Sequence, residues 1–483
     1  MKVTFLIPPV LDGTANVERC SGCNYGLYFF PLLPVLNIAT LLKGKTERIS
    51  ILDFPAQKKT VKNFQDFITM DDSHIYVFYT VFLCQETDRI ARELIRDARK
   101  DARFIFCGPQ PTSSPESFLD QGDTFVIRGE PEFSTRDLIF ALESKSTLEN
   151  VKGLSYLDGL SLKHNPAEPF IADIDQVPIP DRMLLDHRPY CNPKLRKTPH
   201  TAIITSRGCF GRCWFCVPNS LDYARELEYK KLYGKKPPPR LHSSERVIRE
   251  FTEIAGLGFK SVTVIDEQFL WDEKRTLEIC TGIKELNLEW GCLARPDKIT
   301  ERVGEAMADA GCRFIDLGME SADEEVLKAI RKDMTLQDTE KAMAILKRNK
   351  IEIEINVLLG ATPKETKESI KKTLKAVKRL KPDYVLFSIA NPFPGTDFYY
   401  AAKKEGWMVY GDYVPVDPAR DAIISYPHLS KEELEDFLRR ASISYYLSPL
   451  YLLKQLTHLK SPRDFLNKLL TACNFFRKSF LRK

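Results

Sequence analysis

Residues Ser206-Arg207-Gly208-Cys209-Phe210-Gly211-Arg212-Cys213-Trp214-Phe215-Cys216 are the most informative part of this chain. The three cysteines follow the spacing C-x3-C-x2-C, directly after the apolar residues 201–205, which predict a strand. Three thiolates on one tight loop can hold three corners of a cubic iron–sulfur cluster and leave the fourth iron open to a small molecule. Structural zinc sites use four ligands, so zinc fits less well, although His200 or Cys191 could complete a zinc shell.

Length and composition are those of a globular enzyme. The 483 residues predict roughly three domains, and 43% hydrophobic with 28% charged residues favours packed cores over disorder. The amino terminus is apolar for too few residues to form a signal peptide. The sequence contains no run of about 18 apolar residues, so no membrane-spanning helix is expected. Twelve cysteines fit metal ligands and reduced thiols better than disulfides, which predicts the cytoplasm. No charged helix dominates, so no nucleic-acid partner is expected.

The first 145 residues predict a doubly wound parallel sheet, because short apolar strands alternate with helical stretches. Ligands of such sheets lie beyond the carboxyl ends of the strands. Two glycine-containing turns are expected there, Gly108-Pro109-Gln110-Pro111-Thr112 and Arg128-Gly129-Glu130. The expected strands are 3–7, 49–54, 75–79, 103–107 and 124–127, and the expected helices are 32–43, 86–100 and 115–121.

Strand and helix alternate again after the cysteine loop. Six such units predict a partial (βα)6 TIM-like barrel with its chemistry at the carboxyl ends of the strands. The expected strands are 202–205, 261–265, 289–294, 313–317, 352–357 and 384–389. The predicted organisation is therefore an α/β chain with a Rossmann-like domain at 1–145, a proline-rich linker at 146–200, the barrel at 201–400 and a helical extension at 401–483.

The cysteine loop resembles the signature of the radical S-adenosylmethionine (SAM) enzymes, including the aromatic Phe215 before the last cysteine. The resemblance implies that Cys209, Cys213 and Cys216 are the ligands of a [4Fe-4S] cluster whose open iron chelates SAM. It also implies cleavage of SAM to a 5′-deoxyadenosyl radical, anaerobic chemistry, and an electron donor such as a reductase, a flavodoxin or a ferredoxin. Further motifs resemble SAM contacts of that family, and they imply roles for Phe215, Glu320, Ser321, Asn356 and Gly360.

The amino-terminal half resembles the cobalamin (B12)-binding domain of one branch of that family, where a Gly-Pro-x-Pro-Thr turn and a later Arg-Gly-Glu occur in this order. The resemblance implies that cobalamin is bound, with the segment beginning at Thr80 and Val81 under the corrin. Asp72-Ser73-His74 begins like the histidine motif of other cobalamin proteins, but Val77 replaces its glycine, so no histidine ligand is expected. The remaining implied cobalamin contacts are Gly108, Pro109, Gln110, Pro111, Thr112, Gly129 and Glu130.

Cys20 and Cys23 form a second CxxC pattern in the loop after the first strand. Thioredoxin-like chemistry would need a helix that begins at the first cysteine. Gly22 and Asn24 favour a loop instead, so a structural role is favoured, and a substrate contact stays open.

The carboxyl-terminal residues 449–483 carry eight basic residues against one acidic residue. An apolar stripe recurs at helical spacing among them, formed by Phe465, Leu469, Cys473, Phe476 and Phe480, and Tyr445, Tyr446, Leu450 and Tyr451 precede it. A basic amphipathic helix can lie on a membrane surface. The alternative is that the stripe packs on the barrel and the lysines stay solvated. The first interpretation predicts peripheral contact at the inner membrane face.

Together these features predict a cobalamin-dependent radical SAM enzyme that abstracts hydrogen from an unactivated carbon. Methyl transfer to a hydrophobic, lipid-like substrate is the preferred reaction. The branch also includes anaerobic Mg-protoporphyrin monomethyl ester cyclases and hopanoid- or lipid-modifying members, so an oxidative cyclase or carbon–carbon coupling enzyme is the alternative. A corrinoid- or cluster-binding sensor without turnover is the second alternative.

Overall fold

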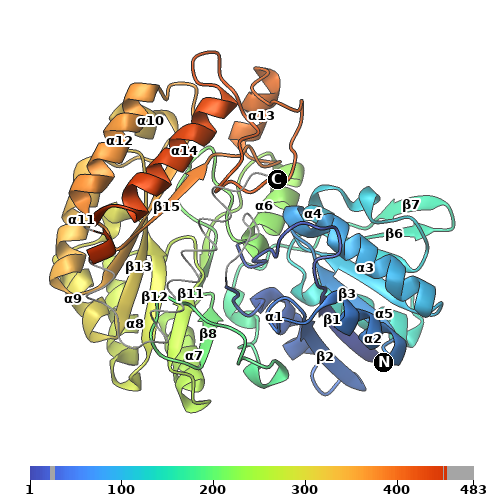
Figure 1. Ribbon diagram of the computed structural model, residues 1–483. Coiled ribbons are helices and arrows are strands. Elements are labelled where there is room, and N and C mark those ends of the chain that lie inside the picture. The colour runs from blue at the N-terminus through green and yellow to red at the C-terminus, as the bar shows by residue number, and fades with distance from the viewer. Residues whose placement is uncertain (22–27, 450, 454–483) are drawn as a thin grey trace. The chain divides into compact units, whose positions relative to one another are not determined.

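A computed structural model describes residues 1–21, 28–449 and 451–453. The chain divides into two compact units. The first comprises Met1–Arg212, Cys216–Leu317 and Ala344–Ile353, and the second comprises Cys213–Phe215, Gly318–Met343 and Glu354–Lys483. Figure 1 shows the elements and their labels.

The amino-terminal part of the first unit is a seven-stranded sheet in the order β2-β1-β3-β4-β5-β6-β7. Strands β1 to β5 pair in parallel, as the alternation of apolar strands and helices predicts. The strands are β1 Lys2–Ile7, β2 Arg48–Asp53, β3 Ile75–Tyr79, β4 Arg103–Cys107, β5 Thr124–Ile127, β6 Leu154–Asp158 and β7 Ser161–His164. The helices are α1 Leu33–Leu42, α2 Val61–Met70, α3 Gln85–Ala98, α4 Pro109–Ser113 and α5 Glu132–Ser144.

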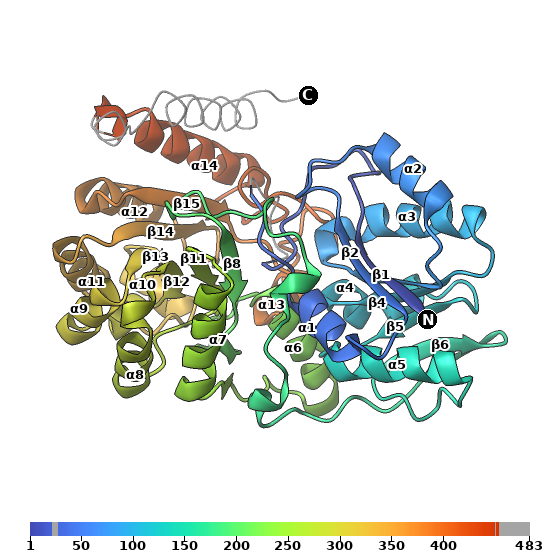
Figure 2. The ribbon, with the colours of Figure 1, turned by 90° about the horizontal axis from the view of Figure 1, so that it is seen from below.

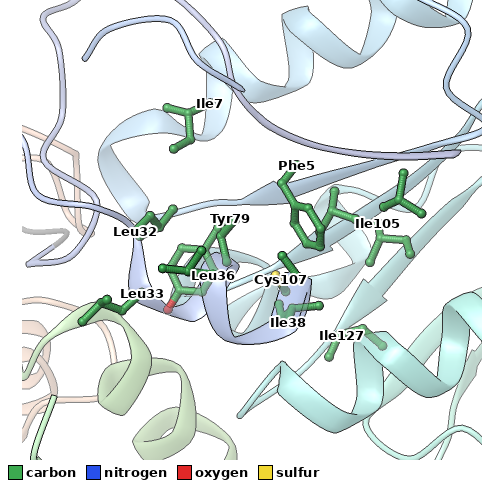
Figure 3. Packing of buried hydrophobic residues seen from close by; sticks show 14 of the residues in the cluster. Phe5, Ile7, Leu32, Leu33, Leu36, Ile38, Tyr79, Ile105, Cys107 and Ile127 are labelled. Carbon is green, nitrogen blue, oxygen red and sulfur yellow. The ribbon is translucent and has the colours of Figure 1, made fainter. Parts of the chain in front are cut away.

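Helices cover both faces of this sheet (Figures 1 and 2). One apolar cluster joins α1 and α5 to alternate residues of the strands, among them Phe5, Tyr79 and Ile105. Figure 3 shows part of this cluster, with Leu36 and Ile38 of α1 facing the strands. A second cluster joins α2 and α3 to the opposite face. The two clusters explain why the strands read as continuous apolar runs, since neighbouring residues are buried on opposite sides.

Helices α2 and α5 were not among the expected helices, and the structure differs from the sequence-based expectation at two further places around this sheet. Strands β6 and β7, which lie in the predicted linker, pair antiparallel with β5 and with each other. The two-residue turn between them has Gly159 at a φ of +60°, which is a hairpin signal. The helix expected at 115–121 is wrong: a short helix, α4, begins at Pro109 inside the predicted turn, and only a single 3-10 turn follows at Pro115–Ser117.

A second sheet has six strands in the order β15-β14-β13-β12-β11-β8, so its strands follow one another across the sheet in chain order. This order is that of the predicted partial barrel. Its strands are β8 His200–Ile203, β11 Ser261–Val264, β12 Glu289–Ala294, β13 Cys312–Glu320, β14 Glu352–Leu359 and β15 Tyr384–Ile389. The intervening helices are α7 Ser244–Gly256, α8 Glu273–Ile283, α9 Glu301–Asp309, α10 Glu324–Ala329, α11 Leu336–Arg348 and α12 Lys367–Leu380.

Several elements stand outside the alternating pattern. Helix α6 (Ser220–Tyr233) follows the cysteine loop, and β9 (Ser206–Arg207) pairs antiparallel with β10 (Arg240–Leu241). Helices α13 (Asp397–Lys404) and α14 (Lys431–Tyr446) belong to the second unit. None of the helices in the described part of the chain combines the length and apolar character that crossing a membrane requires. The apolar stripe from Phe465 to Phe480 lies outside the described residues, and so does Leu450.

Candidate functional site

The cysteine loop begins where β9 ends, after β8 of the six-stranded sheet. Cys209, Cys213 and Cys216 form no disulfide and are partly exposed, whereas most other described cysteines are buried. The backbone N–H of Gly211 donates a hydrogen bond to Cys209 Sγ at 3.3 Å. Hydrogen bonds to sulfur are one means by which proteins tune iron–sulfur clusters. The three cysteine thiols are therefore chemically suited to act as thiolate ligands of an iron–sulfur cluster.

The described residues contain no group of three or more His, Cys, Asp or Glu side chains placed to hold a metal ion. Cys213 belongs to the second unit, whereas Cys209 and Cys216 belong to the first. Their role as cluster ligands stays a prediction. Both ring nitrogens of His200 have other partners inside the first unit: Nδ1 lies 2.8 Å from Ser261 Oγ and Nε2 lies 3.3 Å from Thr263 Oγ1.

Buried carboxylates fix the backbone on which the cysteine loop starts. Asp266 accepts hydrogen bonds from the N–H and Oγ1 of Thr205, both at 2.6 Å, and from Ser206 Oγ at 2.7 Å. Burial raises the pKa of Asp266 to about 6. Asp222 of α6 accepts the backbone N–H of Gly208 at 2.7 Å. The residue before Cys209 is therefore held by a side chain rather than by a strand partner.

Trp214, in the second unit, is a residue of the loop that sequence reasoning did not single out. Its indole Nε1 donates to the carbonyl of Ala361 at 2.8 Å, and its ring lies 5.2 Å from that of Phe398. Ala361 follows Gly360, one of the predicted SAM contacts. Trp214 thus fastens the centre of the cysteine loop to the turn after β14.

Glu320 ends β13 in a backbone conformation that is rare for a residue with a side chain. Its φ is +62°, and such strain concentrates at functional sites. Its carboxylate accepts a hydrogen bond from Lys332 Nζ at 2.8 Å, and both side chains are largely buried. A Cβ at Gly318 would lie 2.7 Å from both charged groups, so the absence of a side chain there leaves room for the pair.

The other predicted SAM contacts lie in the same unit. Ser321 is buried and shares a hydrogen bond with Thr373 at 3.1 Å, and it accepts the N–H of Asp323 before α10, which indicates a structural role for the hydroxyl. Asn356 lies within β14, and Phe215 is partly exposed. Gly360 has a φ of +72° and is packed against Leu434.

Glu365 is a buried acid that closes the turn after β14. It accepts the backbone N–H of Gly360, and burial raises its pKa from 4.5 to about 8. The unfolded chain releases this proton at lower pH than the folded chain does. The contribution to stability is therefore complete below about 4.5 and is lost as the pH rises toward about 8.

We expect Glu365→Gln to remove this pH dependence, because an amide oxygen can still accept the backbone hydrogen bond while the group cannot ionise. The melting temperature of the wild-type chain should fall relative to that of the variant between about pH 5 and pH 8. Two melting curves that shift in parallel across this range would contradict the assignment.

The two glycine turns of the first unit are joined to each other. Thr112 Oγ1 donates to the carbonyl of Gly108 at 2.8 Å and accepts the N–H of Gly129 at 3.0 Å. Gln110 Oε1 is buried and has no hydrogen-bond partner in the described part of the protein. Pro109 and Pro111 are buried in α4. The turns therefore form one body at the carboxyl ends of β4 and β5.

We expect Gly108→Ala to destabilise this body. Gly108 has a φ of +106°, and an added Cβ would lie 2.7 Å from the carbonyl oxygen of Thr80, which is backbone. Strain and crowding together predict a loss of at least about 2 kcal/mol in the free energy of unfolding. Gly122→Ala is the matched control, because nothing lies within 4 Å of its added Cβ. Urea unfolding of both variants measures the difference, and equal midpoints would refute it.

A buried ion pair supports the segment after β3. Asp88 of α3 accepts hydrogen bonds from Thr80 Oγ1 at 2.8 Å and from both Nη atoms of Arg19, at 2.7 and 2.8 Å. Arg19 Nη1 also donates to the carbonyl of Tyr79 at 2.7 Å. Val81 is buried next to this network. The predicted corrin-facing segment therefore has a rigid polar support on the protein side.

Glu130 has partners that the sequence did not reveal. Its carboxylate accepts hydrogen bonds from Arg207 and Arg240, each at 2.7 Å. Burial raises the pKa of Glu130, but the two guanidinium groups outweigh burial and lower it to about 2. Its carboxylate is thus occupied by arginines, and a cobalamin contact of this residue would have to come from its backbone.

The remaining candidates are less central. Cys20 is buried, its Sγ donates to the carbonyl of Pro31 at 3.3 Å, and burial raises its pKa well above the usual thiol value. These contacts suit a structural thiol, and Cys23 lies outside the described residues. His74 precedes β3, and its Nδ1 accepts the N–H of Lys2 at 3.0 Å, so it stands at the amino ends of the strands.

Comparison with known proteins gives matches along the chain. Residues 203–377 match the model of the radical SAM superfamily. An uncharacterized methyltransferase of Pyrococcus horikoshii is 28% identical over 94% of this chain and 95% of its own length. An anaerobic magnesium-protoporphyrin IX monomethyl ester cyclase of Cereibacter sphaeroides is 24% identical over 76% of this chain, which spans only 58% of that relative.

The fold also has a counterpart among solved structures. The cobalamin-dependent SAM radical enzyme OxsB, with aqua-cobalamin and SAM bound, superposes with a TM-score of 0.68 at 17% identity. The match covers 99% of this chain and 71% of that enzyme. At this level of identity the likeness concerns the fold.

Proposed function

We propose that this chain, which is a radical SAM enzyme, uses cobalamin and transfers a methyl group to an unactivated carbon of a small, hydrophobic substrate. The observation that carries the proposal is the C-x3-C-x2-C loop, which follows β8 and β9 inside the matched superfamily region. Cobalamin is supported by the joined glycine turns at the carboxyl ends of β4 and β5, and by the fold likeness to an enzyme that binds it.

The residues present fit the three groups. Cys209, Cys213 and Cys216 would hold the cluster, which, when reduced, supplies the electron that cleaves SAM. The Glu320–Lys332 pair would orient polar groups of SAM. Asn391, after β15, is buried, and neither polar atom of its side chain has a partner in the described residues, so it offers a donor and an acceptor suited to an adenine edge.

For cobalamin, the protein would contribute shape rather than a metal ligand. Gln110 Oε1 can accept a hydrogen bond from a corrin amide. Val81, Phe82 and Leu83 provide a buried apolar surface held in place by the Asp88 network. We also propose a cobalamin-binding domain at 1–145 that extends through the β6–β7 hairpin of the predicted linker 146–200, a barrel at 201–400 and a helical extension at 401–483.

The hydrophobic nature of the substrate and a peripheral place at the membrane rest on the sequence of residues 449–483. The relatives include a hopanoid C-3 methylase of Methylococcus capsulatus, at 24% identity over 62% of this chain. We propose a lipid-like substrate and a cytoplasmic enzyme on this basis, with a reductase, flavodoxin or ferredoxin as the electron donor.

Anaerobic turnover tests the proposal. The reconstituted protein is incubated with SAM, cobalamin, a reductant and a lipid extract from its source, and 5′-deoxyadenosine and S-adenosylhomocysteine are quantified together. A parallel rise of both products is expected for methyl transfer. Deoxyadenosine alone would favour an oxidative cyclase or a coupling enzyme instead. Binding of both cofactors without deoxyadenosine would identify a sensor and overturn the enzymatic assignment.

A further inference from the structure

A dry cluster of five charged side chains lies inside the first unit. Arg207 donates from Nη1 to Glu130 at 2.7 Å and from Nη2 to Glu132 at 2.6 Å, and the exposed fractions of these three side chains are 2%, 2% and 0%. Arg240 donates to Glu130 at 2.7 Å, and Arg225 lies 3.6 Å from the same carboxylate. These ion pairs are therefore shielded from water, and each buried charge depends on its partner for compensation.

The geometry of the cluster is set by strand pairing. Arg207 of β9 and Arg240 of β10 are direct partners in the antiparallel ladder, where like charges repel. Glu130 lies between the two guanidinium groups and offsets this repulsion. The ring of Phe170 lies 4.3 Å from the Arg240 guanidinium and 4.7 Å from that of Arg225. The arginines are therefore fixed from two sides.

The cluster connects the starting points of two predicted cofactor loops. Arg207 stands two residues before Cys209, and Glu130 directly follows Gly129, whose N–H is bonded to Thr112. A buried ionic cluster is weak evidence for stability, because apolar residues of similar volume do as well or better. What it provides is orientation, since two carboxylates hold one planar guanidinium in a single position.

We propose that Glu130, Glu132 and Arg207 are positioning residues that hold the start of the cysteine loop, Arg207–Cys209, against the carboxyl ends of the strands that carry the two glycine turns. One change in the cluster would then alter the environment of both cofactors. Both halves of this inference rest on the proposed function: the cobalamin half on cobalamin binding, and the iron–sulfur half on the three cysteine ligands.

Glu130→Gln and Glu250→Gln are a matched pair of variants that test this role. Glu250 of α7 is likewise buried and accepts hydrogen bonds from two arginines, Arg182 and Arg246, both at 2.6 Å. These two arginines belong neither to the cluster nor to either glycine turn. Both variants should melt at lower temperature than the wild type, so thermal stability serves as the common control.

The readouts are the absorption spectrum and affinity of bound hydroxocobalamin and the electron paramagnetic resonance spectrum of the reduced, reconstituted cluster. We expect Glu130→Gln to weaken cobalamin binding about tenfold, which corresponds to about 1.4 kcal/mol, because the glycine turns lose their fixed position. It should also alter the spectrum of the iron–sulfur cluster, as changes next to metal ligands do. Glu250→Gln should leave both unchanged. Glu130→Asp, which keeps the charge on a shorter side chain, should show smaller changes of the same kind.

Equal effects of Glu130→Gln and Glu250→Gln on both readouts, or no effect of Glu130→Gln on either, would overturn the positioning role. A wild-type chain that binds no cobalamin would overturn the proposed cofactor instead. In that case the electron paramagnetic resonance spectrum of the iron–sulfur cluster alone decides. A change specific to Glu130→Gln supports the positioning role, and an unchanged spectrum refutes it.

Discussion

Cys213→Ala should abolish the cleavage of SAM. The predicted cluster has three protein ligands, and the loop offers no replacement thiol, because Cys209 and Cys216 already occupy the other two corners. The variant should yield 5′-deoxyadenosine only at the level of protein without a cluster. The measurement is anaerobic incubation with SAM and dithionite, together with the iron content after reconstitution.

Cys191→Ala is the control for this result. Cys191 is also a free and partly exposed thiol, but it lies outside the loop, and the zinc alternative would make it a fourth ligand. The control variant should keep iron content and SAM cleavage. Undiminished 5′-deoxyadenosine from Cys213→Ala would contradict the assignment of this cysteine as a cluster ligand. Loss of metal from Cys191→Ala would instead favour a zinc site that includes Cys191.

Asp88→Ala should destabilise the chain more than Gly108→Ala does. It leaves the guanidinium of Arg19, which is only 6% exposed, without its carboxylate. Removing one partner of a buried ion pair costs about 3–5 kcal/mol, because the other charge stays buried and uncompensated. Thr80 Oγ1 also loses its acceptor, so the segment under the predicted corrin should loosen.

The matched control lies on the same helix. Asp97 pairs with Lys100 at 3.3 Å with both side chains about four-fifths exposed, so Asp97→Ala should change the free energy of unfolding by less than about 0.5 kcal/mol. Urea unfolding at neutral pH measures both variants. If Asp88→Ala lost no more stability than Asp97→Ala, the buried pair of Arg19 and Asp88 would not contribute to the free energy of unfolding.

Much of the fold could be predicted because its signals are local. Strands β3, β4 and β5 begin and end where the apolar runs predict, since burial on both faces leaves an uninterrupted apolar signature. The β6–β7 hairpin was missed, although Gly159 marks its turn, because the surrounding prolines favoured a linker. The short helix at Pro109 was missed because two prolines in five residues read as a turn.

The sequence alone determined the cysteine spacing, the alternation of strands and helices, and hence the match of residues 203–377 to the radical SAM superfamily model, because each depends on residues close together in the chain. Only the tertiary structure decided which groups meet. Glu130 and Arg207 are 77 residues apart, and Trp214 and Ala361 are 147 apart. Side chains so distant in sequence are brought together by the packing of whole sheets and helices, and no local pattern encodes which carboxylate a given arginine will reach.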